Sequence, residues 1–376
     1  MNWLRALAWP LAIVTLASVI YVVRVQREMA DFAVIRTAGT RALSGESLYR
    51  ESDGHYQYKY LPLFAFAMAP FARIDPEAGK AIWFALSVGL LSALIRWSVR
   101  SLPERRKSER ALIWFAILFM GKFYAHELNL GQTNILLGTI LIGALLSVQV
   151  DQVGLAGALV ALGIFVKPYA IVLLPWLALS AGLPGILVAG AVLAAGLMLP
   201  AFVYGWNGNL DQIVAWYRTV TETTAPNLLG ADNISFATMW AKWVGPGTLA
   251  ARLAVATGLA ALALAAATMT RRRNVSEPSY LEFGLLMLLV PLLSPQGWDY
   301  VLLLATPAII CLIDRFSDLS RPWRTFTMTA LVLMSFTIFD LLGRTLYAKL
   351  MAISIVSLAA LALVVSLAHL RWRTLA

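Results

Sequence analysis

The stretch REMADFAVIRTAGTRALSGESLY, residues 27–49, comes directly after an almost unbroken apolar run at positions 3–23. A transmembrane helix needs about 20 consecutive apolar residues, so the run is long enough to cross a bilayer. No small-residue cleavage site follows it, and we interpret it as a membrane span rather than a removed signal. Asp31 therefore lies a few residues beyond the expected exit from the membrane.

The residues after Asp31 have the pattern of an amphipathic helix. Apolar or small side chains recur at helical spacing, while polar ones lie largely on another side, which predicts a helix lying on the membrane surface. The Ser44-Gly45 pair should end it. The apolar side comprises Phe32, Ile35, Gly39 and Ala42 or Leu43, and the polar side comprises Arg36, Thr37, Thr40 and Arg41.

The composition places the whole 376-residue chain in the membrane. Hydrophobic residues make up 60% and charged residues 13%, whereas a soluble domain is about one quarter charged. The apolar runs are continuous rather than alternating, so the spans should be helices and not barrel strands. The net charge of +10 lies in short loops between these runs, which argues against nucleic acid as a partner. A single cysteine excludes a disulfide framework or a Cys-rich metal site.

We therefore expect an all-α polytopic protein, one integral-membrane domain over residues 1–376, with about twelve spans. The expected spans are 4–25, 77–98, 110–124, 132–149, 153–166, 168–182, 185–204, 249–269, 279–294, 300–313, 325–341 and 351–369. Asp75-Pro76 should open the second span as its N-cap and first turn.

The distribution of Lys and Arg predicts the orientation. These residues concentrate in loops that lie on the cytoplasmic side if both termini are cytoplasmic. Two long loops, about 26–76 and 205–248, then face outward. Loops of this length in a compact protein are usually functional, so we expect the site on the extracytoplasmic face.

Polar residues gather at one short outer turn between two expected spans. The cluster consists of His126, Glu127, Asn129, Gln132 and Asn134. These side chains need partners, because an unsatisfied polar group in hydrocarbon costs several kcal/mol. Mutual hydrogen bonding with capping of the next helix is one interpretation, and substrate binding is the other. One His and one Glu are too few for a metal site.

Other outer segments offer further candidates. Asp31 could cap its helix, pair with Arg27 or Arg36, or face a substrate at the membrane surface. Lys167 could be a snorkelling lysine or a ligand for a headgroup phosphate. The remaining candidates lie in the aromatic segment 56–64, the second long loop and a late outer turn. They are Lys59 and Tyr60, then Asn227, Asp232 and Asn233, then Trp298, Asp299 and Tyr300.

Nucleotide-binding motifs are absent from the sequence. It contains no GxGxxG after a strand, no Walker A loop and no Asp-x-Asp pair that would hold a metal–nucleotide sugar. If a group is transferred on the outer face, its donor must arrive already activated. A sugar linked to a lipid phosphate meets that demand.

Five segments occur in an order that resembles glycosyltransferase family 87, the polyprenyl-phosphate-mannose-dependent mannosyltransferases of the GT-C fold. They are SGESLY after the first-loop acid, YKYLPLFAFAMAP, LNLGQTNILL, VKPYAIVLLP and LLSPQGWDY. The resemblance covers about residues 30–307. It implies a multi-pass protein of the bacterial cytoplasmic membrane whose active site is periplasmic. It also implies that Asp31 is the catalytic base.

One position departs from the family pattern. A histidine is expected after the outer-turn tryptophan, whereas this chain has Trp298, Asp299 and Tyr300. Either Asp299 or Tyr300 could replace it, so mannose is the family's default sugar rather than a deduction.

We expect an inverting transfer in which Asp31 activates a hydroxyl of a glycolipid or glycan acceptor. A lipid phosphate leaves without protonation and needs a cation rather than a second acid, so no metal or cofactor is expected. The candidates for that cation, in falling order, are Lys167, Lys59, Arg36 and His126, and the aromatic residues Tyr56, Tyr58, Tyr60 and Phe64 would line the approach from the membrane lipids. The alternatives are a lipid-linked-sugar flippase or transporter, and an inactive scaffold.

Overall fold

The computed structural model describes residues 15, 18–270, 272 and 278–373. Most of the first expected span, 4–25, lies outside these residues. The described part is built of helices. In order they are η1 (Val25–Arg27), α2 (Ala30–Ser44), η2 (Glu51–Tyr56), α3 (Pro62–Ala67), α4 (Ala69–Ala72), α5 (Pro76–Arg100), α6 (Glu109–Leu130), α7 (Asn134–Gln149), α8 (Val153–Val166), η3 (Pro168–Leu173), α9 (Leu174–Met198), α10 (Ala201–Glu222), α11 (Thr224–Asn227), α12 (Phe236–Val244), α13 (Thr248–Met269), α14 (Pro278–Leu293), η5 (Asp299–Ala305), α15 (Thr306–Asp314), η6 (Phe316–Asp318), α16 (Arg321–Phe336), α17 (Phe339–Ala352) and α18 (Ile355–Arg373).

Several helices have the length and composition of membrane spans. The described residues contain five such helices, or up to six if α16 and α17, which bend by 104°, form one span. Helices α7, α8 and α14 are apolar but shorter. These features fit a multi-pass membrane protein, but the expected number of about twelve spans is not confirmed. The expected spans 168–182 and 185–204 illustrate the difference, since the apolar stretch Pro168–Met198 counts as one candidate.

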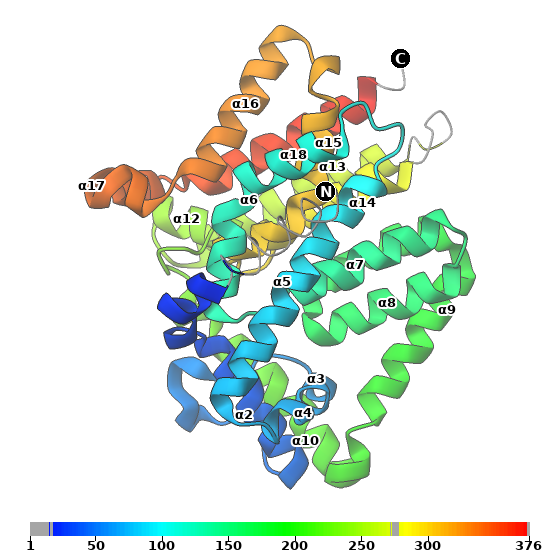
Figure 1. Cartoon of the computed structure of the whole chain (residues 1–376), viewed down its shortest axis with the longest axis vertical. Coiled ribbons are helices and arrows are strands. Elements are labelled where there is room, and N and C mark those ends of the chain that lie inside the picture. Colours follow the sequence, from blue (N-terminus) through cyan, green and yellow to red (C-terminus); the bar gives the residue numbers. More distant parts are fainter. Residues whose placement is uncertain (1–14, 16–17, 271, 273–277, 374–376) are drawn as a thin grey trace, which may run out of the picture.

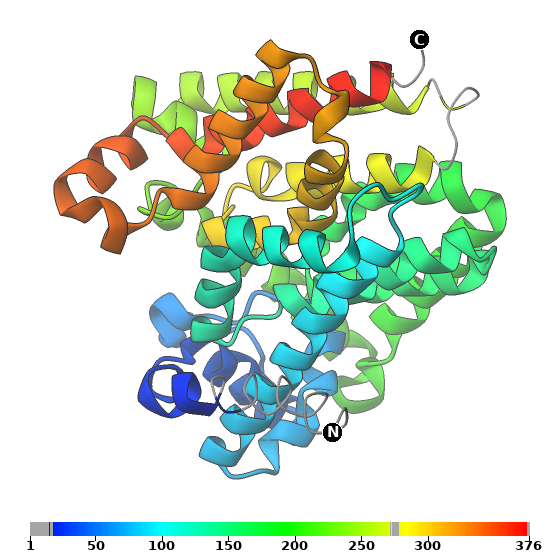
Figure 2. The same ribbon diagram turned by 45° about the horizontal axis from the view of Figure 1, so that its top comes forward.

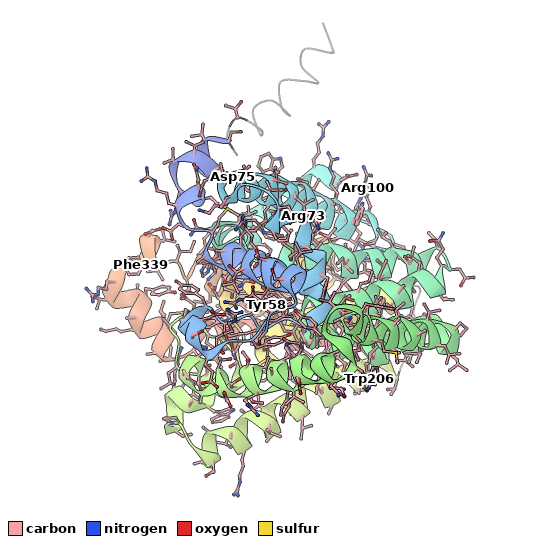
Figure 3. The ribbon with its side chains drawn as sticks, turned by 90° about the horizontal axis from the view of Figure 1, so that it is seen from below. Tyr58, Arg73, Asp75, Arg100, Trp206 and Phe339 are labelled. Atoms are coloured by element: carbon pink, nitrogen blue, oxygen red, sulfur yellow. The ribbon has the colours of Figure 1, made fainter. Side chains whose placement is uncertain are left out.

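The two long loops of the sequence analysis carry much of the helical structure at one end of the molecule. Helices α2, α3 and α4 of the first loop and α10 of the second gather there, away from α15, α16 and α18 (Figure 1). The turned view keeps the same separation (Figure 2). Seen from below, Tyr58 lies near the centre of this end, between α2 and α10 (Figure 3).

The predicted amphipathic helix is confirmed as α2. Phe32, Ile35 and Gly39 are buried, and Gly45 ends the helix in the left-handed conformation with φ +65°. Gly39 allows a close approach to the α3–α4 junction, because a Cβ at this position would lie 2.8 Å from the carbonyl oxygen of Met68. This packing fixes the face of α2 that carries Asp31.

The predicted start of α5 is also confirmed. The Asp75 side chain accepts hydrogen bonds from the backbone amides of Glu77 and Ala78, each at 3.0 Å, and Pro76 is the first helical residue. Farther along α5, the indole of Trp83 donates to the carbonyl oxygen of Gly131 at 3.0 Å. Helix α5 therefore holds the turn between α6 and α7.

That turn is stabilised by Glu127, which is fully buried. Its carboxylate accepts hydrogen bonds from the backbone amides of Asn134 and Ile135 and from the side-chain amide of Asn134 at 2.9 Å. The two backbone amides belong to the first residues of α7, and amides at the start of a helix have no acceptor within the helix. Capping and substrate binding were both possible roles for this cluster. The contacts of Glu127 are those of a helix cap.

We expect Glu127→Ala to lower the free energy of unfolding by about 1–3 kcal/mol, because buried amide donors would lose their acceptor. Thermal unfolding of the purified protein in detergent measures the effect. The matched control is Glu222→Ala, at an exposed position at the end of α10. Equal melting temperatures for the two variants would contradict a capping role.

Candidate functional site

A cavity of about 1010 Å³ lies between the two long loops and the ends of the apolar helices that adjoin them. Its wall comes from segments far apart in the sequence: α2, the residues before α3, the α6–α7 turn, the start of η3, α10, and the turn between α14 and η5. The apolar part of the wall includes Ile171, Val172, Val290 and Leu293. The cavity can therefore take a molecule with both polar and apolar parts.

Asp31 lies in the wall of this cavity. Burial raises the pKa of its carboxyl above the usual range, while Lys167, the Gln132 amide and Lys59 act in the opposite direction by stabilising the charge. Among the described residues, no arginine forms an ion pair with Asp31. The carboxylate thus faces two lysines across the cavity instead of pairing on its own helix.

Gln132 connects this carboxylate to one of the lysines. Its side-chain oxygen accepts from Lys167 Nζ at 3.3 Å and from the Tyr60 hydroxyl at 3.2 Å. An ammonium can only donate, so the Gln132 oxygen must point toward Lys167. The amide nitrogen consequently points toward the Tyr300 hydroxyl, at 3.3 Å, and Asp31. Gln132 holds the Asp31 carboxylate in a defined orientation.

The two lysines form the cationic part of the cavity. Lys59 Nζ donates to the side-chain oxygen of Gln296 at 3.2 Å, and Lys167 Nζ lies 4.5 Å from the centre of the Tyr60 ring. Burial lowers the pKa of both lysines, and Asp31 acts against this effect. An incoming anion would compensate the buried charge and favour the protonated form of each.

A second group of polar side chains lies at the turn between α14 and η5. His126 Nδ1 lies 2.9 Å from Asp299 Oδ1, and the His126 ring meets the Tyr300 ring edge-on with centroids 5.1 Å apart. Asp232, which also lines the cavity, accepts a hydrogen bond from the Tyr347 hydroxyl at 2.9 Å. Asp299 itself does not line the cavity. It orients His126, which does line the cavity.

The structure brings ten of the predicted residues into the wall of one cavity. They are Asp31, Tyr56, Lys59, Tyr60, His126, Gln132, Lys167, Asp232, Trp298 and Tyr300.

The other predicted residues do not line it. Arg36 donates to the carbonyl oxygen of Ile74 at 2.9 Å. Asn134 bonds to Glu127, and the Asn129 side-chain oxygen is buried without a protein partner. Asn233 donates to the carbonyl oxygens of Asn227 and Pro295 and forms an isolated β-bridge with Trp298. These contacts shape the turn that presents Trp298.

Sequence reasoning missed several wall residues. Gln296 holds Lys59 and also donates to Thr223 and Thr224, although it lies in the quoted LLSPQGWDY segment. Trp216 lines the cavity and its indole donates to the carbonyl oxygen of Lys59 at 3.1 Å. Its position on α10 gives no local sequence signal. The described residues contain no group of three or more His, Cys, Asp or Glu side chains that could hold a metal ion.

Comparison with known proteins identifies the family. A search of curated proteins and a search of solved structures found no match. The model of glycosyltransferase family 87 matches residues 58–295, well over half of the chain. The matched segment includes Lys59, Gln132 and Lys167 of the cavity wall. The chain therefore belongs to glycosyltransferase family 87, and it is a membrane glycosyltransferase.

Proposed function

We propose that this glycosyltransferase moves a sugar, mannose by family default, from a polyprenyl-phosphate donor to a hydroxyl group of a glycolipid or glycan. The reaction takes place on the periplasmic side of a bacterial cytoplasmic membrane, and the distribution of Lys and Arg, which favours an outward position for the two long loops, supports this side. The observation that supports this proposal is a half-buried carboxylate, Asp31, in the wall of the same cavity as two half-buried lysines, Lys59 and Lys167. One cavity thereby offers a carboxylate that can act as a base toward the acceptor hydroxyl and two cations that can bind the phosphate of the donor.

Asp31 accepts the proton of the attacking hydroxyl as its oxygen bonds to the anomeric carbon of the donor. The bond from that carbon to the phosphate oxygen breaks at the same time, and the phosphate leaves with the electron pair. Attack from the face opposite the phosphate inverts the configuration. Because Asp31 is partly buried, its raised pKa makes it a stronger base than an exposed aspartate, while Gln132 keeps it oriented.

Lys59 and Lys167 stabilise the negative charge that grows on the departing phosphate. Fixed cations in a water-poor cavity are effective at this task because they need no reorganisation during the reaction. The apolar wall from η3 and α14, including Ile171 and Val290, suits the isoprenoid part of the donor. Tyr60, His126 and Trp298 are then the ring systems available to the sugar.

We expect Asp31→Asn to reduce sugar transfer by about 10²- to 10⁴-fold, because the loss of a general base has effects of this size. The assay supplies purified protein in lipid nanodiscs with labelled polyprenyl-phosphate-mannose and follows the label into acceptor and free sugar. Size-exclusion profile and melting temperature serve as folding controls. Movement of the intact donor across the bilayer without transfer, unchanged in Asp31→Asn, would instead support a flippase.

The pH dependence tests the electrostatic coupling at the site. Transfer requires ionised Asp31, so the rate falls on the acid side as pH drops through its raised pKa. Lys59 stabilises the ionised form. Lys59→Gln should raise this pKa further and move the acid limb of kcat/KM toward higher pH. The control Lys349→Gln, exposed on α17, should leave the limb in place. If the acid limb of kcat/KM stays at the wild-type pH in Lys59→Gln, the electrostatic coupling between Lys59 and Asp31 is contradicted.

A further inference from the structure

A second hollow of about 440 Å³ lies along the outer face of α2. Its lining includes one stripe of the helix, since positions 30, 33, 34, 37 and 41 repeat at intervals of three and four residues. The rest comes from the segment that follows α2. The full lining is Ala30, Ala33, Val34, Thr37, Arg41, Asp53, Tyr56 and Tyr58.

The hollow adjoins the large cavity. Ala30, Val34 and Tyr56 line both, and Asp31 lies next to Ala30 in the wall of the large cavity. Ten residues separate Asp31 from Arg41 on α2, which corresponds to about 15 Å at 1.5 Å per helical residue. A ligand in the hollow would extend from the base toward Arg41, with one end close to Asp31.

The charge of the hollow differs from that of the large cavity. Its charged lining residues are Arg41 and Asp53. They form a bidentate ion pair, with Arg41 Nη1 2.5 Å from Asp53 Oδ2 and Arg41 Nη2 2.8 Å from Oδ1. The guanidinium next to it lowers the pKa of the Asp53 carboxyl, so the pair stays ionised at neutral pH and its net charge is zero. An anionic group would find no uncompensated cation here.

The remaining lining suits a neutral polyol. Thr37 is exposed and carries a hydroxyl that can donate and accept. Tyr56 is 56% exposed and offers an aromatic ring at the boundary between the two cavities. The outer oxygens and nitrogens of the Arg41–Asp53 pair supply acceptors and donors without net charge.

We propose that this hollow is the acceptor subsite of the glycosyltransferase and that it takes a neutral glycan. The terminal sugar of the glycan reaches past Ala30 and Val34 to place its hydroxyl at Asp31, while the inner sugars lie along α2 toward Arg41. The anionic donor occupies the large cavity with its lysines. This inference rests on the proposed function and adds the charge class and the direction of approach of the acceptor.

The test measures how the sugar of the donor is divided between acceptor and water. Wild-type protein in nanodiscs receives labelled polyprenyl-phosphate-mannose with either a neutral octyl mannoside, the n-octyl glycoside of an α-1,2-linked mannotriose, or its 6-phosphate, in which the phosphate is on the reducing-end sugar that would lie toward Arg41. Ala33→Trp fills the hollow from an exposed position on α2, and Leu43→Trp is a control on the same helix outside the lining. Melting temperatures of the variants show that each is folded.

We expect wild type to prefer the neutral octyl mannoside. Ala33→Trp should lower the ratio of transfer to donor hydrolysis by about tenfold, equivalent to about 1.4 kcal/mol. Leu43→Trp should keep the wild-type ratio. Asp53→Asn, which leaves Arg41 uncompensated, should shift preference toward the 6-phosphate.

The outcomes against the inference are distinct from failure of the proposed function. An unchanged ratio in Ala33→Trp, a wild-type preference for the 6-phosphate, or donor hydrolysis without transfer to octyl mannoside overturns the neutral-acceptor subsite alone. Absence of both hydrolysis and transfer in the wild-type protein counts against the proposed function and the inference together.

Discussion

The site depends on mutual compensation between charges that are costly to bury. An isolated carboxylate or ammonium in an apolar environment loses several kcal/mol of hydration, and in proteins the usual response is a shift in pKa. Asp31, Lys59 and Lys167 show such shifts in the same cavity. Asp31 stabilises the charge of both lysines across the space that a substrate would fill, and they stabilise its charge, whereas the two lysines repel each other. The electrostatic balance of the empty cavity therefore depends on these three side chains.

Rigid secondary structure holds these groups in place. Lys167 follows the end of α8, Asp31 stands in the first turn of α2, and Gln132 lies in the turn that Glu127 stabilises. Close packing of Gly131 against Phe32, where a Cβ would lie 2.9 Å from the Phe32 Cβ, and the Trp83–Gly131 hydrogen bond join α2 and α5 to that turn. The long apolar helices act as a scaffold, and the cavity is lined by the ends of the helices and the turns between them.

Local signals in the sequence predicted the parts of this arrangement that depend on neighbouring residues. The pattern around Phe32 predicted α2, and Asp75-Pro76 predicted the start of α5. Polar residues in otherwise apolar surroundings pointed to Gln132 and Lys167, because such residues need partners. Trp216 was missed, because its role comes from one contact with the backbone of Lys59, over 150 positions away. Asn233 and Glu127 looked like substrate ligands because their side chains are polar, whereas their burial satisfies nearby backbone groups.

The division into spans was less predictable, since apolar composition does not reveal where a helix breaks. Gly182, with φ +63°, interrupts the geometry of α9 within a stretch that remains apolar throughout. Helices α7 and α8 are apolar yet short, and α15 continues from the 3-10 helix η5. Hydropathy measures preference for an apolar environment, which burial among other helices satisfies as well as lipid does.

The bond from Trp216 to the Lys59 carbonyl, together with that from Gln296 to the Lys59 ammonium, has a consequence for biogenesis. The ribosome makes position 59 long before positions 216 and 296. During synthesis, Lys59 therefore lacks both partners until the two later segments have been made. Completion of the cavity is thus a late event in folding, and a chain arrested before position 296 would carry Asp31 without the full cavity wall around it.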